Sequence, residues 1–366
     1  MKYYIIAGEA SGDLYGSLLM TEIKKGDPQA VFKFWGGPKM RTVSSGQLKS
    51  IKETSFMGFY EVAKNALKIK GFFDFAKYSI QEFQPDMIIL IDYPGFNLRM
   101  TTWAKDKGYN ITYYISPQLW AWKKNRHKIL KEKVDLFYVI LPFERDFYRN
   151  LDTPCEFVGH PLLEVIDKPN THLSETVNNI GLFPGSRKQE IKNHLSIMLQ
   201  FAMDKPEYKF IIAGVSHIPR SFYLDQLNQY AAHIDIRYDA SYEVMKEIDF
   251  AITSSGTATL ELALFNVPQI VVYKTHQISF MIGKRIVSTD YISLVNLIAQ
   301  KEVVPELLQD AFNELALDKY FSALTPMDKR EEIIEHYSKI RGELGSKPSS
   351  HLVAKGILQY LNIATS

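Results

Sequence analysis

The chain has 366 residues, which is enough for two domains that each own a hydrophobic core. Its 46% hydrophobic and 23% charged content is ordinary for a soluble globular protein, and the formal net charge is only +2. The single cysteine, Cys155, excludes an intrachain disulfide and a cysteine-cluster metal site. No apolar run approaches the roughly 20 residues that span a bilayer, and no secretory signal opens the chain. We therefore expect a cytoplasmic protein that meets a membrane only at its surface.

The first half alternates short apolar runs with helical stretches. Strands are predicted at residues 3–7, 31–35, 87–91, 111–115 and 136–141. Residues 8–13, Gly-Glu-Ala-Ser-Gly-Asp, form a strand-to-helix turn before a helix over about residues 14–24. The spacing is not G-x-G-x-x-G, so a dehydrogenase is not indicated. This alternation predicts a parallel sheet with helices on both faces and ligands at the carboxyl ends of its strands.

Asp92 follows the most hydrophobic of these strands, Met-Ile-Ile-Leu-Ile at 87–91. A carboxylate in that place is partly desolvated, which raises its pKa toward the range that a general base requires. The alternative is a structural carboxylate that caps the following helix or bonds a turn N–H. After it, Tyr93-Pro94-Gly95 forces a turn, and Asn97 is a candidate helix cap.

Residues 56–73 combine apolar side chains at helical spacing with interleaved lysines. Such a stripe can lie in the interface of a bilayer, although it is more often the core-facing side of a helix. The candidate membrane contacts are Phe59, Ile69, Phe72 and Phe73, with Lys64, Lys68 and Lys70 at the rim.

A second basic interval, residues 123–133, follows Trp120 and Trp122. Nucleic acid is one possible partner, but no DNA- or RNA-binding module is visible and the charge is too local. Anionic lipid headgroups or a phosphorylated substrate fit this interval better.

Residues 160–170, with proline near both ends, form the candidate linker, after which the strand and helix pattern restarts. Strands are predicted at 180–183, 210–213, 234–238, 250–253 and 269–273, and helix from about residue 305 to the end. Two α/β halves joined by a short linker imply a ligand-binding cleft between them.

Two strand-to-helix turns of the second half have the composition of phosphate sites. Pro184-Gly185-Ser186-Arg187 precedes a helix over 188–202, and Ser254-Ser255-Gly256-Thr257 precedes a helix over 258–265. Small residues let the backbone approach a ligand, and the helix dipole favours an anion there. Arg187 would add a planar fork for phosphate oxygens, and Glu261 could accept from a ribose hydroxyl. The alternative for each turn is an ordinary helix start that binds nothing. Neither turn ends as a P-loop does, and no carboxylate or histidine cluster has metal-ligand spacing.

The chain resembles the lipid-A-disaccharide synthase family, glycosyltransferases of the GT-B fold. The resemblance runs nearly end to end through blocks in one order: GEASGD at 8–13, GGPKM at 36–40, MGFYEV at 57–62, IDYPGFNLR at 91–99, SPQLWAW at 116–122, LPFERDFY at 141–148, FVGHPL at 157–162, FPGSR at 183–187, SSGTATLE at 254–261, VVYK at 271–274, SLVNLIA at 293–299 and VVPELLQ at 303–309. The departures are Gly95, where the family commonly has an acidic residue, and Val295, where it has proline. The first leaves Asp92 as the one carboxylate of its loop.

The resemblance implies that UDP-2,3-diacylglucosamine donates its sugar to 2,3-diacylglucosamine 1-phosphate, which gives a β-1,6 disaccharide and UDP. Asp92 would deprotonate the acceptor hydroxyl in an inverting displacement, with no metal or other cofactor. The implied donor-site residues are Gly185, Ser186, Arg187, Ser255, Gly256, Thr257, Glu261, Asn296 and Gln309, and the implied acceptor-site residues are Gly8, Ser11, Gly12 and Asp13. Because both substrates carry acyl chains, the resemblance also favours the membrane interpretation of residues 56–73, at the cytoplasmic side of the inner membrane.

The resemblance implies three parts: an N-terminal Rossmann-like acceptor domain at 1–163, a Rossmann-like UDP-sugar domain at 164–345, and a C-terminal helix at 346–366. That helix would pack back on the first domain or exchange with a partner in a homodimer. Two rival functions remain at this point: a UDP-N-acetylglucosamine 2-epimerase, which needs no acceptor, and a non-catalytic lipid- or nucleotide-binding protein.

Overall fold

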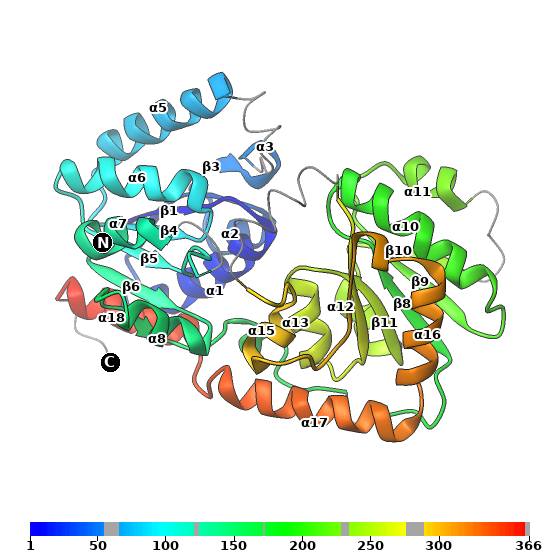
Figure 1. Cartoon of the computed structure of the whole chain (residues 1–366). Helices are drawn as coiled ribbons and strands as arrows, with labels where there is room; N and C mark the ends of the chain where they lie inside the picture. The colour runs from blue at the N-terminus through cyan, green and yellow to red at the C-terminus, as the bar shows by residue number, and fades with distance from the viewer. Residues whose placement is uncertain (55–65, 121–123, 171–172, 228–233, 276–288, 363–366) are drawn as a thin grey trace. The chain divides into compact units, whose positions relative to one another are not determined.

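The computed structural model describes residues 1–54, 66–120, 124–170, 173–227, 234–275 and 289–362. The chain divides into two compact units (Figure 1). Unit 1 comprises Met1–Glu164 together with Leu344–Ser366, and unit 2 comprises Val165–Glu343.

Unit 1 is built on a seven-stranded sheet in the order β3-β2-β1-β4-β5-β6-β7, in which every neighbouring pair is parallel. Its strands are β1 (Lys2–Ala7), β2 (Val31–Gly36), β3 (Gln47–Ser50), β4 (Met87–Ile91), β5 (Ile111–Tyr114), β6 (Leu136–Val139) and β7 (Glu156–Phe157). The helices are α1 (Ala10–Gly26), α2 (Pro38–Val43), α3 (Ile51–Thr54), α5 (Ala66–Phe83), α6 (Pro94–Asp106), α7 (His127–Lys133), α8 (Pro142–Arg149), α9 (Leu162–Val165) and α18 (Ser349–Tyr360), with a short 3₁₀ turn at Lys124–Arg126.

Helices cover both faces of this sheet, as Figure 1 shows. Alternate residues of β1, β4 and β5 pack with α5, α6 and α7 in one cluster that includes Tyr4, Ile88 and Tyr113. The opposite face meets α1, where a Cβ placed on Gly16 would lie 3.3 Å from Ile91 Cδ1. Burial on both faces explains why the central strands read as continuous apolar runs.

Unit 2 is built on a six-stranded parallel sheet in the order β10-β9-β8-β11-β12-β13. Its strands are β8 (Asn179–Phe183), β9 (Lys209–Gly214), β10 (Ile234–Tyr238), β11 (Phe250–Ser254), β12 (Gln269–Tyr273) and β13 (Glu306–Leu308). Its helices are α10 (Lys188–Met203), α11 (Arg220–Leu227), α12 (Ser241–Glu247), α13 (Thr257–Leu264), α15 (Leu294–Ala299), α16 (Glu314–Leu324) and α17 (Met327–Glu343), with a 3₁₀ turn at Gln309–Ala311.

The prediction of two parallel α/β sheets is confirmed, and three details of it are corrected. The chain after residue 305 does not run as helix to its end, because β13 first pairs with β12. Two edge strands, β3 and β7, were not predicted. Asn97 does not cap a helix: it lies inside α6, whose N-cap is Tyr93.

Helix α5 contains the described part of the predicted membrane segment, and Phe59 and Lys64 lie outside the described residues. The expectation that Phe72 is exposed is wrong, because its side chain is buried against Trp35, with ring centroids 5.9 Å apart. Phe73 is half-buried and stacks on Phe96 at 4.1 Å. Ile69 is partly exposed, and the lysines at positions 68 and 70 are exposed.

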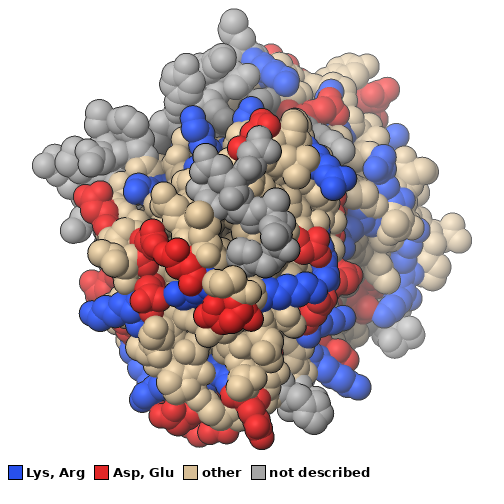
Figure 2. Space-filling model, turned by 90° about the vertical axis from the view of Figure 1, so that its right-hand side faces the viewer, with Lys and Arg blue, Asp and Glu red and all other residues tan. Residues whose placement is uncertain are grey.

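Acidic and basic side chains are interspersed over the face that Figure 2 displays, without a large patch of one sign. In unit 2, for example, Arg237 pairs with Asp235 and Glu247, and Lys205 pairs with Asp318 at 2.5 Å. Within the described part of the chain, no helix is long and apolar enough to cross a membrane.

Candidate active site

The loop after β4 holds Asp92 in an unusual backbone conformation. Asp92 and Tyr93 have φ values of 46° and 50°, so two consecutive residues other than glycine are left-handed. The Asp92 carbonyl accepts from Asn97 Nδ2 at 2.8 Å and from the Tyr113 hydroxyl at 2.9 Å. Its N–H donates to the Tyr114 carbonyl at 3.0 Å. The loop is therefore fixed at the carboxyl edge of the sheet, where the sequence predicts a reactive carboxylate.

The surroundings of Asp92 favour its protonated form. Burial is the largest cause, the negative charge of Glu9 is the second, and that of Glu144 adds a smaller effect, against a backbone N–H donated by Tyr93. Together they raise the pKa of Asp92 from 3.8 to about 7. A carboxyl group with this pKa is ionised in a large fraction of molecules at neutral pH and is basic enough to take a proton from a bound hydroxyl.

The predicted acceptor turn at residues 8–13 is shorter than expected, because α1 begins at Ala10, and its Gly8 packs against Tyr93 next to Asp92. A Cβ on Gly8 would lie 2.4 Å from the Tyr93 ring, so only glycine lets the two loops pack this closely. Glu9, which the sequence reasoning did not single out, is the N-cap residue of α1. Gly12 is buried against Ala7, and Ser11 is partly exposed.

The Asp13 side chain connects two segments of unit 1, which its position in the sequence does not indicate. The side chain is buried, and its two oxygens accept from the backbone N–H groups of Gly37, Lys39 and Met40 at 2.7–3.0 Å. These are N-terminal N–H groups of α2, so Asp13, in the first turn of α1, joins the starts of the two helices.

A further buried carboxylate lies behind this site, on α8. Glu144 accepts from the backbone of Ile140 and Leu141 and from Trp120 Nε1 at 3.2 Å. Burial raises the pKa of Glu144 to about 7, although these donors act in the opposite direction. Glu144 joins the loops after β5 and β6 and adds negative charge near Asp92.

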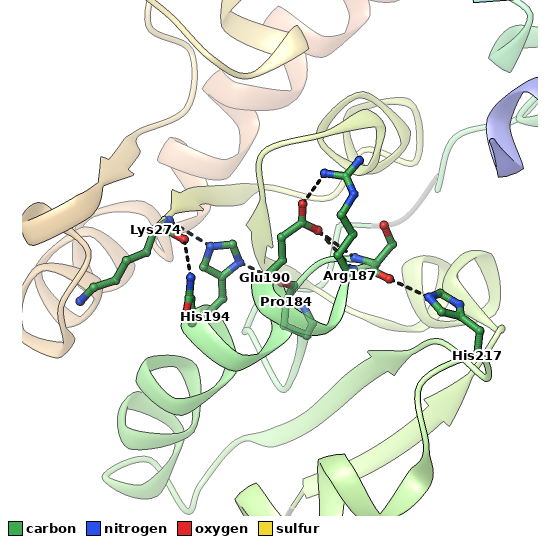
Figure 3. Close-up of polar contacts among 8 residues, drawn as sticks. Pro184, Arg187, Glu190, His194, His217 and Lys274 are labelled. Carbon is green, nitrogen blue, oxygen red and sulfur yellow. Dashed lines mark hydrogen bonds and ion pairs between the residues drawn. The ribbon is translucent and has the colours of Figure 1, made fainter. Parts of the chain in front are cut away.

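In unit 2, the turn after β8 is held by side chains of α10, as Figure 3 shows. Glu190 Oε2 accepts from the N–H groups of Ser186 and Arg187, both at 3.3 Å, and Glu190 Oε1 pairs with Arg187 Nη1 at 2.7 Å. Gly185 has φ 114°, and a Cβ there would lie 2.7 Å from Glu190. The composition of this turn predicts a phosphate site. Glu190 accepts from two N–H groups of this turn and also pairs with the Arg187 guanidinium, so a phosphate here would share these groups with Glu190.

Two histidines fix the same turn (Figure 3). His194 is fully buried, with Nδ1 at 2.8 Å from the Pro184 carbonyl and Nε2 accepting from the Lys274 N–H at 3.0 Å. A carbonyl can only accept, so the proton is on Nδ1 and the ring is neutral, in agreement with a pKa that burial lowers. His217 Nε2 lies 2.9 Å from the Ser186 carbonyl.

The turn after β11 differs because the N-cap residue of the helix that follows it is a glycine, which has no side chain to cap the helix. Gly256 is the N-cap residue of α13 and makes no side-chain cap hydrogen bond. Strand β11 pairs with β8, and a Cβ on Gly185 would lie 3.3 Å from Ser254 Oγ. The turn after β8, which contains Arg187, and the turn after β11 therefore lie at the same edge of the sheet.

Glu261 lies on α13, and burial raises the pKa of its side chain. Its Oε1 accepts from the Tyr242 hydroxyl at 3.0 Å. Tyr242 lies on α12, and no sequence signal marks it as part of a site.

The polar groups of three other predicted donor-site residues form hydrogen bonds within unit 2. Ser255 donates to the Ile292 carbonyl at 2.9 Å. Asn296 is buried and bonds Val303, Val304 and Glu306, and Gln309 bonds both backbone groups of Thr275. The structure thus brings Arg187, the uncapped turn and the Glu261 helix to one sheet edge and uses Asn296 and Gln309 to brace segments beside it.

Comparisons with known proteins agree with this arrangement. A sequence model of the family described as lipid-A-disaccharide synthetase matches residues 3–352. The lipid-A-disaccharide synthase of Syntrophus aciditrophicus is 37% identical over 355 residues, which cover 93% of each chain. That of Nitrosococcus oceani is 35% identical over 355 residues, which cover 93% of this chain and 92% of the relative.

Among solved structures, the fold resembles that of the UDP-GlcNAc 2-epimerase from Neisseria meningitidis bound to UDP-GlcNAc, with a TM-score of 0.65, 12% identity and coverage of 98% of this chain and 100% of that one. It also resembles the glycotransferase of kitacinnamycin, with a TM-score of 0.66, 10% identity and 98% coverage of both chains. At these identities the likeness shows the GT-B fold alone. The sequence comparisons establish that the chain belongs to the lipid-A-disaccharide synthase family, glycosyltransferases that form the disaccharide of lipid A.

Proposed function

We propose that unit 1 binds the lipid acceptor and supplies the base, and that unit 2 binds the UDP-sugar donor. The acceptor is 2,3-diacylglucosamine 1-phosphate and the donor is UDP-2,3-diacylglucosamine. Asp92 takes the proton of the acceptor 6-hydroxyl while that oxygen attacks the anomeric carbon of the donor. The bond to UDP breaks in the same step, which inverts the anomeric configuration and gives a β-1,6 linkage.

The observation that supports this proposal most strongly is the state of Asp92. Its carboxyl group sits at the carboxyl edge of a parallel sheet, held by hydrogen bonds of its own backbone, and its pKa is raised to about 7. A purely structural helix cap would accept N–H groups of its helix and would have a lowered pKa. Gly8, Glu9 and Ser11, at the start of α1, would line the acceptor side, while the buried Gly12 and Asp13 support this part of the helix.

Charged and hydrogen-bonding groups of unit 2 support the proposal that this unit binds the donor. Arg187 and the uncapped start of α13, at Gly256 and Thr257, offer positive charge and N–H groups to a diphosphate. As UDP departs it gains negative charge, so these groups stabilise the transition state more than the ground state. Glu261 would accept from the ribose.

The decisive experiment mixes the purified full-length protein with donor and acceptor and follows disaccharide and UDP by mass spectrometry. Both products should appear only when both substrates are present. Conversion of UDP-N-acetylglucosamine alone would instead identify an epimerase, and tight binding without turnover of either substrate would identify a non-catalytic protein.

We further propose that α5 brings the enzyme to the inner-membrane surface, where the acyl chains remain in the bilayer. Extracting a chain would cost roughly 0.8 kcal/mol per methylene, so taking the headgroup at the interface is easier. The exposed lysines at 68 and 70 and the partly exposed Ile69 and Phe73 support this role.

The double variant Lys68→Glu/Lys70→Glu should bind vesicles of anionic phospholipid several-fold more weakly, and added salt should weaken wild-type binding in the same direction. The matched control is Lys339→Glu/Lys355→Glu, which changes two exposed lysines on α17 and α18. Equal loss in both double variants would point to net charge rather than α5. The homodimer implied by the family remains a prediction, which a light-scattering measurement of the molar mass would test.

A further inference from the structure

The donor-side carboxylate Glu261 is held by a residue from a different helix. The Tyr242 hydroxyl donates to Glu261 Oε1 at 3.0 Å, from the first turn of α12 to the middle of α13. Both side chains are partly buried. The hydrogen bond therefore forms where competing water is limited, which makes it stronger than a surface contact.

Tyr242 is itself fixed in place. Its ring packs edge-on against Phe265, the C-cap residue of α13, with ring centroids 5.5 Å apart. Burial and the adjacent Glu261 charge raise the pKa of the Tyr242 hydroxyl, so this group stays protonated and can only act as the donor to the carboxylate.

The terminal torsion of a glutamate is soft, so an unheld carboxylate samples a broad range of orientations. A hydrogen bond to Oε1 removes that freedom and aims the remaining acceptor positions in one direction. The bond also favours the ionised carboxylate, against the burial that raises the pKa of Glu261. An ionised and oriented carboxylate is the acceptor that a pair of ribose hydroxyls requires.

We propose that Tyr242 is a positioning residue that orients Glu261 toward the ribose and so makes the donor site selective for ribonucleotides over deoxyribonucleotides. This inference rests on the proposed donor site in unit 2. In such a site the 2′-hydroxyl of a ribonucleotide donates to a buried acceptor. A 2′-deoxynucleotide lacks this hydroxyl and leaves the acceptor unpaired, so it binds more weakly.

The test measures the dissociation constants of UDP and 2′-deoxy-UDP for the full-length protein by calorimetry. Wild type should prefer UDP by about tenfold or more, the value of one hydrogen bond to a charged group. Tyr242→Phe keeps the ring and its contact with Phe265 and should reduce that preference about threefold or more. Glu261→Gln should remove most of the preference.

The control is Tyr223→Phe, which deletes a buried hydroxyl of the same unit that accepts from the Val215 N–H at 3.1 Å. It should lose similar stability and keep the wild-type preference. A change in Tyr223→Phe as large as that in Tyr242→Phe would overturn the proposal, because it would trace the effect to general loosening of unit 2.

A pH series gives a second readout that a merely structural role would not change. UDP binding should weaken on acidification as Glu261 takes a proton, and in Tyr242→Phe this weakening should occur at higher pH, since the donor that favours the carboxylate is gone. If Glu261→Gln loses the preference but Tyr242→Phe matches wild type in both readouts, the inference fails and the donor site stands. If Glu261→Gln keeps the preference, the donor site itself is wrong.

Discussion

The left-handed pair at Asp92 and Tyr93 carries a conformational cost. For residues other than glycine this conformation costs roughly 1–2 kcal/mol each, and it persists only where surrounding contacts enforce it. Here Asn97 and Tyr113 donate to the same carbonyl, and the Tyr93 ring fills the space that Gly8 leaves open. The strained backbone therefore sets the position of a carboxylate whose pKa is raised to about 7.

Replacing the Asp92 carboxylate by an amide tests its role as the base. Asp92→Asn should retain substrate binding and lose roughly 10²- to 10⁴-fold in kcat, because an amide cannot take the proton. In wild type, kcat/KM should rise with pH through about 7, as Asp92 ionises. Kinetics over pH 5–9 will check both, and near-normal turnover of the variant would leave Asp92 a structural role.

The same pKa predicts how stability depends on pH. Between about pH 4 and 7 the unfolded chain has released the Asp92 proton while the folded protein still binds it, so the free energy of unfolding falls as pH rises. Asp92→Asn should therefore match wild type near pH 4 and be the more stable protein at pH 8, as measured by denaturant unfolding. A stability difference between the two proteins that is the same at pH 4 and pH 8 would show that folding does not shift the pKa of Asp92.

Arg187 is the residue whose loss should affect the donor most. Arg187→Ala removes a positive charge from the proposed diphosphate site and should weaken donor use by roughly 30- to 1000-fold, or about 2–4 kcal/mol. The control Arg220→Ala removes an exposed arginine from the start of α11 in the same unit. Kinetics at varied donor concentration will compare the two, and equal losses would remove Arg187 from the site.

At the scale of elements, the strands that consist of apolar runs were predicted from the sequence, and the strands without such a run were missed. The central strands were found because burial on both faces makes them continuously hydrophobic. Strands β3, β7 and β13 are short edge strands of two to four residues, and no apolar run marks them. Asp92, Arg187 and Glu261 were found because each follows a strand or a small-residue turn. Glu190 was missed although its position, three residues after the N-cap residue of α10, is typical of a capping glutamate. Tyr242 was missed because its contact with Glu261 depends on packing between α12 and α13.

Glu144, at the start of α8, likewise makes a contact with a residue that is distant in the sequence. Glu144 satisfies backbone N–H groups at the helix start and the Trp120 indole from the loop after β5. Glu144→Gln should lower the free energy of unfolding by about 1–3 kcal/mol, because an amide cannot accept from all of these donors and one is left unsatisfied. The control is Glu132→Gln on α7, where the side chain is exposed. Unchanged stability of Glu144→Gln in denaturant unfolding would show that water replaces the lost acceptor.

At the scale of the whole molecule, the two units differ in how the chain builds them. Unit 2 is one continuous segment, whereas unit 1 is completed by residues that follow unit 2 in the sequence. Helix α18 packs on α1, where Leu358 lies against Gly26, and Ser349 bonds the Tyr114 hydroxyl at 2.7 Å. The stability of unit 1 therefore depends on α18, which follows unit 2 in the sequence.

Gly356 provides a sharp test of that dependence. A Cβ added there would lie 1.9 Å from the hydroxyl of Tyr138, a buried residue of β6, so Gly356→Ala must displace α18 or the tyrosine. We expect it to destabilise unit 1 by about 1–3 kcal/mol, the range typical of overpacking. Gly342→Ala is the matched control, because a Cβ there meets nothing within 4 Å and helix propensity favours alanine. Thermal unfolding should show a loss for the first variant and a small gain for the second, while both bind UDP as wild type does. A Gly356→Ala protein with unchanged stability would show that α18 contributes little to unit 1, and one with weakened UDP binding would show that α18 also acts on unit 2.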